Sequence, residues 1–94
     1  MEDLENRMDP ASEFFLEAEA AMLRGEHQEA LDQFAKLFRE HPTSCLADNA
    51  LLSIATIHMN RGNMAMGQKV LTSLLKQYPD SDAAAEAKEL IDEI

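Results

Sequence analysis

Apolar residues recur every three or four positions in several stretches of the chain, which is the spacing of one face of an α-helix. The pattern is clearest over about 27–41 and again over about 64–78. The apolar positions in these two stretches are Ala30, Leu31, Phe34, Leu37 and Phe38, and then Val70, Leu71, Leu74 and Leu75. Further apolar stretches lie before, between and after these two, so the pattern predicts several helices joined by short links.

Glycine, proline and capping residues mark where these helices begin and end. Gly25 and Gly62 supply the left-handed residue that ends a helix, and Pro42 and Pro79 stop the helices before them. The predicted helices run from an Asp9-Pro10 start to about Arg24, over 27–41, from a Ser44 cap to about Arg61, over 64–78, and from a Ser81 cap through Ile94. The fold class is therefore predicted to be all-α.

The chain contains an internal repeat, which appears when it is compared with itself at an offset of 37 residues. At this offset Arg24-Gly25 aligns with Arg61-Gly62, Pro42 with Pro79 and Ser44 with Ser81. The apolar positions also align: Phe15 with Leu52, Ala18 with Ala55, Met22 with Met59, Phe34 with Leu71 and Leu37 with Leu74. Each half is thus predicted to be two helices joined at the glycine.

The order of small, aromatic and turn residues resembles the tetratricopeptide repeat. The residues that carry the resemblance are Ala18, Gly25, Ala30, Phe34, Leu37 and Pro42, then Ala55, Gly62, Gly67, Leu71, Leu74 and Pro79. The second copy departs from the pattern where Leu71 replaces an aromatic residue and Gly67 an alanine. The resemblance implies a helix-turn-helix solenoid over 10–94 with two repeats, about 10–42 and 44–79, and a C-terminal capping helix, about 81–94.

The link between the repeats points to a subset of this family. The usual period is about 34 residues, and the longer link here contains H-P-x-S-x-x-A-D-x-A-L, echoed by Y-P-D-S-D-A-A-A-E-A. These segments resemble bacterial envelope members, namely the periplasmic protein of the Tol-Pal system and the lipoprotein of outer-membrane barrel assembly. The resemblance implies a periplasmic or envelope location. No export signal is visible, so the cytoplasm stays as the alternative.

The first residues form a separate segment, 1–9, in which Met1, Leu4 and Met8 recur at helical spacing. One heptad is too short to hold a coiled coil by itself. We expect an N-terminal tail, and the stub of a preceding helix is the alternative.

Composition and charge exclude several functions. Eight Lys and Arg stand against eighteen Asp and Glu, so the net charge is −10 and a nucleic-acid partner is not expected. The middle segment 41–79 is nearly neutral between acidic ends, a pattern usual for solvated faces. No run of about 18 apolar residues is present, so no membrane insertion is expected. Three glycines and three prolines argue against a turn-rich β-sandwich.

The residues with reactive side chains do not form a convincing site. His27, His41 and His58 lack the close spacing of metal ligands with each other, and Pro42 separates His41 from Cys45. Ser73 and Lys76 match S-x-x-K without the further motifs of serine acylases. We expect no metal, no cofactor and no enzyme. The alternative is a thiol or serine activity at Cys45 or Ser73.

By resemblance, the chain is expected to be a protein-interaction module that binds a peptide segment or a partner domain. The first helix of each pair lines the concave face in such solenoids. The expected protein-binding residues are Phe15, Glu19 and Met22 from the first repeat and Leu52, Thr56, Met59 and Asn60 from the second. Methionine adapts to imperfectly matched peptides, and Glu19 favours ligands with Lys or Arg. The alternative for Met22 and Met59 is packing within the superhelix.

Two further expectations concern the kind of partner. A clamp for a C-terminal carboxylate is not expected, because Phe15 and Leu52 stand where Asn or Lys would serve. The alternative to partner binding is self-assembly, in which Phe14, Leu23 or Ile94 is buried against another copy and the chain is a structural unit of a homo-oligomer.

Overall fold

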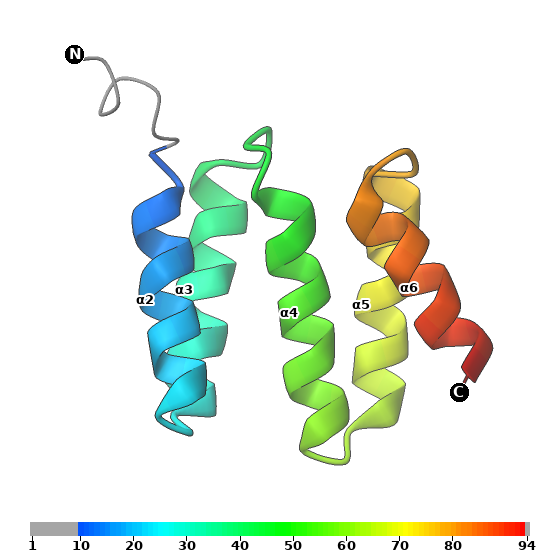
Figure 1. Ribbon diagram of the computed structural model, residues 1–94, viewed down its shortest axis with the longest axis horizontal. Helices are drawn as coiled ribbons and strands as arrows, with labels where there is room; N and C mark the ends of the chain where they lie inside the picture. The colour runs from blue at the N-terminus through cyan, green and yellow to red at the C-terminus, as the bar shows by residue number, and fades with distance from the viewer. Residues whose placement is uncertain (1–9, 94) are drawn as a thin grey trace. The chain divides into compact units, whose positions relative to one another are not determined.

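Residues 10–93 are described by a computed structural model, and within them the chain forms five helices and no strand (Figure 1). The helices are α2 (Ser12–Leu23), α3 (His27–Glu40), α4 (Ala47–Asn60), α5 (Met64–Gln77) and α6 (Asp82–Glu93). The predicted all-α fold of paired helices is confirmed. The expected tail or stub at 1–9, the Asp9 cap and the Ile94 end lie outside the described residues.

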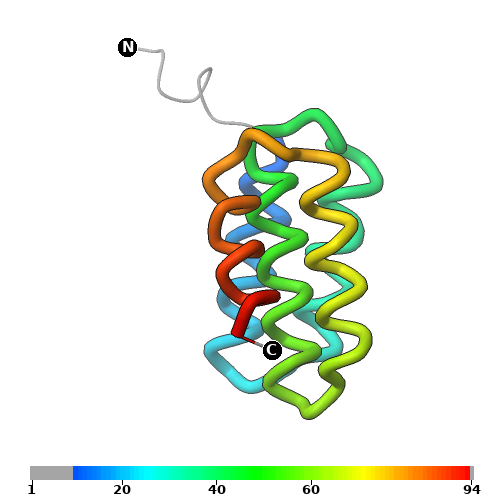
Figure 2. Tube along the Cα trace, turned by 90° about the vertical axis from the view of Figure 1, so that its right-hand side faces the viewer, coloured from blue at the N-terminus to red at the C-terminus, as the bar shows by residue number. Residues whose placement is uncertain are grey.

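The chain divides into two units, residues 1–47 and 48–94. In the first unit α2 and α3 pack together, and the chain reverses direction between them (Figure 2). In the second unit the direction reverses from α4 to α5 and again from α5 to α6, and α6 packs on α5. The predicted helix-turn-helix pairs therefore correspond to α2 with α3 and to α4 with α5.

The first pair turns at Gly25, whose backbone φ is +80°. Its N–H donates to the Met22 carbonyl at 3.0 Å, and the Glu26 N–H donates to the Ala21 carbonyl at 2.9 Å. These two bonds make a Schellman motif, which satisfies carbonyl groups that the end of α2 would leave without partners. A residue with a side chain rarely adopts this φ, so the glycine decides where the helix ends.

The second pair repeats this turn 37 residues later. Gly62 has φ +86°, its N–H donates to the Met59 carbonyl at 3.0 Å, and the Asn63 N–H donates to the His58 carbonyl at 2.8 Å. The Asn63 side chain also accepts from the Met66 N–H at 3.3 Å, so it caps α5. The predicted helix ends at the two glycines are confirmed.

The two links that contain proline and serine also share a backbone geometry. His41 and Tyr78 both have φ −134°, with ψ 59° and 60°. The Ser44 N–H donates to the His41 carbonyl at 3.0 Å, and the Ser81 N–H donates to the Tyr78 carbonyl at 3.2 Å. The sequence echo between H-P-x-S and Y-P-D-S therefore has a structural cause, because each makes the same turn at the end of a helix.

The two serines then act differently, and one predicted cap is wrong. Ser81 caps α6 as predicted, because its hydroxyl accepts from the Ala84 N–H at 3.0 Å. The Ser44 hydroxyl instead accepts from the Leu46 N–H at 2.9 Å. A serine hydroxyl that bonds two residues ahead can close a turn, and here the regular helix begins only after that turn. Helix α4 consequently begins three residues later, at Ala47.

The first helix also starts later than predicted. Pro10 lies in a turn, Ala11 is the N-cap, and the helix begins at Ser12. The Ala11 carbonyl accepts from the Phe15 N–H at 3.1 Å. The fixed φ of proline suits a turn as well as a first helical turn, so the Asp-Pro pair located this start only to within two residues.

Each unit pairs small buried side chains with large ones. In the first unit, α2 buries only alanines, Ala18 and Ala21, whereas α3 buries Phe34 and Leu37 together with Ala30. In the second, α5 buries Leu71 and Leu74, and the alanines on α6 are buried: Ala83, Ala84 and Ala87. Small side chains let helix backbones approach closely, and the large ones fill the remaining space.

Replacement of Gly62 by alanine should destabilise the second unit. Nothing lies within 4 Å of an added Cβ, so the cost comes from the left-handed backbone and should be about 1–2 kcal/mol. Gly62→Asn should cost less, since asparagine tolerates this conformation better. Urea unfolding followed by circular dichroism measures both variants, and an asparagine as costly as alanine would contradict the backbone explanation.

Candidate functional site

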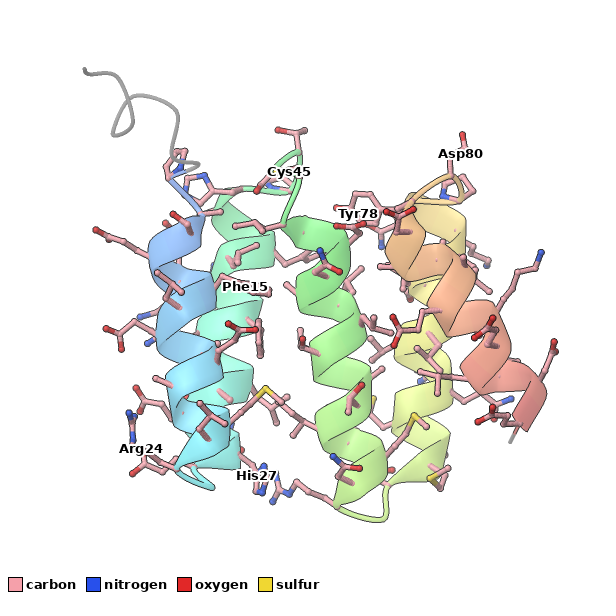
Figure 3. All side chains as sticks on the ribbon, viewed as in Figure 1. Phe15, Arg24, His27, Cys45, Tyr78 and Asp80 are labelled. Carbon is pink, nitrogen blue, oxygen red and sulfur yellow. The ribbon has the colours of Figure 1, made fainter. Side chains whose placement is uncertain are left out.

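Phe15 is a structural residue of the first unit as much as a surface residue. Its ring meets the Phe34 ring edge to face, with centroids 5.6 Å apart and an interplanar angle of 72°. Figure 3 places Phe15 on α2 next to α3, and the side chain is half-buried. Such aromatic pairs are worth about 0.5–1.5 kcal/mol beyond their buried area. Only part of Phe15 therefore remains to contact a ligand.

Glu19 and Met22, one turn of α2 apart, lie together at a surface hollow. The hollow has a volume of about 240 Å³ and is lined by Glu19, Met22 and Leu23. Glu19 is exposed, Met22 is half-buried, and the Leu23 side chain is 90% exposed. The structure thus brings together two of the three residues predicted for the first repeat and adds a leucine that sequence analysis assigned to self-assembly.

The four residues predicted for the second repeat lie on one side of α4. They are spaced at i, i+4, i+7 and i+8, which places them along one face of a helix: Leu52, Thr56, Met59 and Asn60. Asn60 is exposed and the other three are half-buried. The Thr56 hydroxyl donates to the Leu52 carbonyl at 2.9 Å. This donor is satisfied within its own helix, so Thr56 has its hydroxyl lone pairs and its methyl group to offer a ligand.

Met59 also packs against the neighbouring helix. A Cβ added at Gly67 would clash with Met59 Cγ and would lie 3.1 Å from both Met59 Sδ and the Ala55 carbonyl oxygen. Helix α5 therefore approaches α4 closely at Gly67, where Met59 occupies the space of a side chain. Met59 thus packs within the second unit, as the alternative interpretation expected, and the half-exposed part of its side chain remains accessible to a ligand.

Two ionisable groups are perturbed near the helix ends. Arg24 binds Glu26 through two nitrogens at 3.0 and 3.2 Å, and this hydrogen bond together with the negative charge of Glu26 raises the pKa of the Arg24 guanidinium. Burial, and secondarily the charge of Asp48, raise the pKa of the Tyr78 hydroxyl. Both effects keep the side chain in the state it has at neutral pH, so neither group is prepared for acid or base chemistry.

The structure also exposes apolar residues that sequence analysis only partly identified. Leu16 is 58% exposed and was not predicted as a surface residue, whereas Leu23 was. Phe14 is half-buried and its ring lies 5.9 Å from the His41 ring, so it is less available for self-assembly than expected. Ile94, the third residue expected there, lies outside the described residues. The internal repeat marks both leucines as unusual in the sequence, because at the offset of 37 residues Leu16 aligns with Ser53 and Leu23 with Asn60, which are polar.

The candidate reactive residues remain apart from one another. Cys45 is exposed in the link between α3 and α4 (Figure 3), and Ser73 is half-buried on α5. Among residues 10–93, no three His, Cys, Asp or Glu side chains come together as a metal site. None of the helices in this described part is both long and apolar enough to cross a membrane.

Comparison with known families gives one result that covers most of the two helix pairs. A family model described as tetratricopeptide repeat matches residues 14–44 and 49–81, which together are more than half of the chain. The first match contains the turn at Gly25 and the second the turn at Gly62. No curated protein matches the chain.

The close approach at Gly67 predicts a coupled pair of substitutions. Gly67→Ala should destabilise the chain even though alanine favours helix by about 1 kcal/mol, because the new methyl group displaces Met59 and crowds the Ala55 carbonyl. In a Met59→Ala background the same substitution should cost less, since the methylene that it meets is gone. A double-mutant cycle from urea unfolding measures the difference. Equal costs in the two backgrounds would show that Met59 does not fill this space.

Proposed function

Because the chain belongs to the tetratricopeptide repeat family, we propose that it binds a protein segment through the first helix of each repeat. The surface on α2 is formed by Phe15, Glu19 and Met22. The surface on α4 is formed by Leu52, Thr56, Met59 and Asn60. These helices line the concave side in the solenoids that the chain resembles, and the family is one of protein-interaction repeats.

The observation that carries this proposal is the combination of half-buried apolar and exposed polar side chains on these two helices. A surface of this kind offers apolar area to a ligand without being an aggregation hazard. Met22 and Met59 are flexible and polarisable, which suits a ligand of imperfect fit. Exposed Glu19 beside the hollow favours a ligand with Lys or Arg next to an apolar residue.

The proposed role is not catalytic. Cys45 and Ser73 lie in different units, and the groups with perturbed pKa values are not suited to proton transfer at neutral pH. Unaltered ligand binding by Cys45→Ser and Ser73→Ala variants would agree with this role. Loss of a hydrolytic or thiol activity in either variant would contradict it.

The proposed partner is a protein of the bacterial cell envelope. The support is the H-P-x-S and Y-P-D-S resemblance, whose serine turns follow α3 and α5. Fractionation of the native cells tests the location, and recovery of the chain only with cytosolic proteins would contradict it.

Self-assembly is the alternative function, and the 90% exposed Leu23 is the observation that favours it. A net charge of −10 works against it, because copies of an acidic chain repel one another. Sedimentation velocity over a range of concentrations distinguishes the two functions. A single monomeric species is the result expected for the binding function.

Ligand binding should depend on the charge of the α2 surface. Peptides selected from a random displayed library on the immobilised chain should be enriched in apolar residues next to Lys or Arg. Glu19→Lys should raise the Kd of such a peptide roughly tenfold, a loss of about 1.4 kcal/mol, because it replaces an attraction by a repulsion. Fluorescence anisotropy with the labelled peptide measures the change.

The matched control for this variant is Glu89→Lys. Glu89 is exposed on α6 and its substitution makes the same change in net charge. The Kd should change less than about twofold in this control. An equal loss in both variants would mean that overall charge, and not the α2 surface, attracts the peptide.

A further inference from the structure

The outer side of α2 carries a row of apolar residues that the fold of the unit does not use. Leu16, Ala20 and Leu23 follow one another at i, i+4 and i+7, on the opposite side of the helix from the buried Ala18 and Ala21. Leu16 and Leu23 are 58% and 90% exposed. We name these three residues the outer stripe. A helix that is apolar on two opposite sides usually buries both of them.

The second repeat shows that the repeat itself does not require these leucines. At the offset of 37 residues, Leu16 aligns with Ser53 and Leu23 with Asn60. Both helices end in the same glycine turn and bury an alanine at the same position, Ala18 in α2 and Ala55 in α4. The leucines are therefore a property of the first repeat alone, which points to a role outside the fold.

A hollow lies next to the outer stripe and makes this part of the surface concave. The hollow has a volume of about 590 Å³, and it is lined by α2 residues together with one residue of α3: Glu13, Phe14, Leu16, Glu17, Ala20, Arg24 and Gln33. All of them belong to the first unit. Large side chains of a partner helix would fit such an open hollow, as they do in helix-in-groove recognition.

The charges around the outer stripe are mainly negative. Glu13 and Glu17 lie along one edge and Glu19 along the other, and all three are exposed. The nearby base, Arg24, is held by Glu26 at 3.0 Å. Three carboxylates thus border the stripe, and the one guanidinium beside them already has Glu26 as its partner. The complementary partner surface is apolar in the middle and basic at both edges.

We infer that the outer stripe of α2 is a second docking surface, which binds an amphipathic helix of another protein that carries Lys or Arg on both sides of an apolar row. Leu16 and Leu23 enter the apolar row of the partner, and Glu13, Glu17 and Glu19 pair with its basic residues. This surface adjoins the ligand face proposed above, because Leu23 borders both and Glu19 contributes to both. Leu16 belongs to the outer stripe alone, so a substitution that includes it tests the stripe.

Two other occupants fit the charges less well. A second copy of the stripe would place Glu13, Glu17 and Glu19 opposite the same acids, and like charges in contact oppose association. The segment 1–9 of the chain contains Glu2, Asp3, Glu5 and Asp9 against a single Arg7, so it would also bring acids toward acids. A basic helix meets neither difficulty.

Designed peptides test the inference directly. One helical peptide of about 18 residues, or five turns, carries a Leu row flanked by Lys, and its counterpart carries Glu in place of every Lys. Fluorescence anisotropy with the full chain should detect micromolar binding of the Lys peptide and at least about tenfold weaker binding of the Glu peptide. The affinity should also fall as salt is added, because the paired charges are at the surface.

The chain itself supplies the decisive variant. Leu16→Ser with Leu23→Asn gives α2 the residues that α4 carries at the aligned positions, so the fold should be retained, and circular dichroism checks that it is. The Kd for the Lys peptide should rise at least about tenfold. The matched control, Met64→Ser with Met66→Asn, removes two apolar residues of α5 that are 42% and 39% exposed. It should leave the Kd within about twofold.

Several results would overturn the inference. Equal binding of the Lys and Glu peptides, or an unchanged Kd in the Leu16 and Leu23 variant, would exclude the stripe as a charge-selective docking surface. A dimer in sedimentation velocity that this variant abolishes would make a second copy the occupant. Tenfold tighter peptide binding after Leu4→Ser and Met8→Ser would make the N-terminal segment the occupant.

Discussion

The arrangement of each helix pair depends on one local constraint, the left-handed residue that ends the first helix. Gly25 and Gly62 adopt φ values of +80° and +86°, and the hydrogen bonds around them satisfy the last carbonyls of α2 and α4. The chain then reverses within three residues, so that the next helix returns alongside. The proposed binding surfaces lie on α2 and α4, the helices that precede these turns. One side of each helix packs against the helix that follows the turn, and the proposed surfaces lie on the remaining sides.

Close packing after the turn decides which part of each side chain is left for a ligand. Part of the Phe15 ring packs against Phe34. Met59 occupies the space that a side chain at position 67 would need, which is free because that residue is Gly67. Phe15 and Met59 therefore stabilise the fold and belong to the proposed binding surfaces. A weaker ligand affinity after a large substitution at either residue could come from loss of the fold as well as from loss of ligand contacts. Exposed Glu19 and Asn60 allow the binding role to be tested separately.

The two repeats share a backbone but not a surface chemistry. Their turns, helix ends and proline links agree at an offset of 37 residues, whereas Leu16 and Leu23 in the first repeat stand where Ser53 and Asn60 stand in the second. A repeat fixes the buried positions because packing tolerates few changes there. Its exposed positions are open to selection for partners. Differences between equivalent positions outside the core are therefore a guide to function in this chain.

The sequence by itself determined the fold class, the helix pairs and the positions of their turns, because glycine at a left-handed position and proline after a helix act through local backbone chemistry. It also placed four predicted binding residues on one face of α4, because their spacing matches the helical repeat: Leu52, Thr56, Met59 and Asn60. The sequence left the bond of the Ser44 hydroxyl open, since a serine hydroxyl can accept from an N–H two or three residues ahead, and only the structure shows which one it is. The tertiary structure also decided which side of α2 is buried. Phe14, Phe15 and Leu16 are consecutive, so apolar residues lie on opposite sides of this helix, and periodicity does not say which side is buried until α3 packs against one of them.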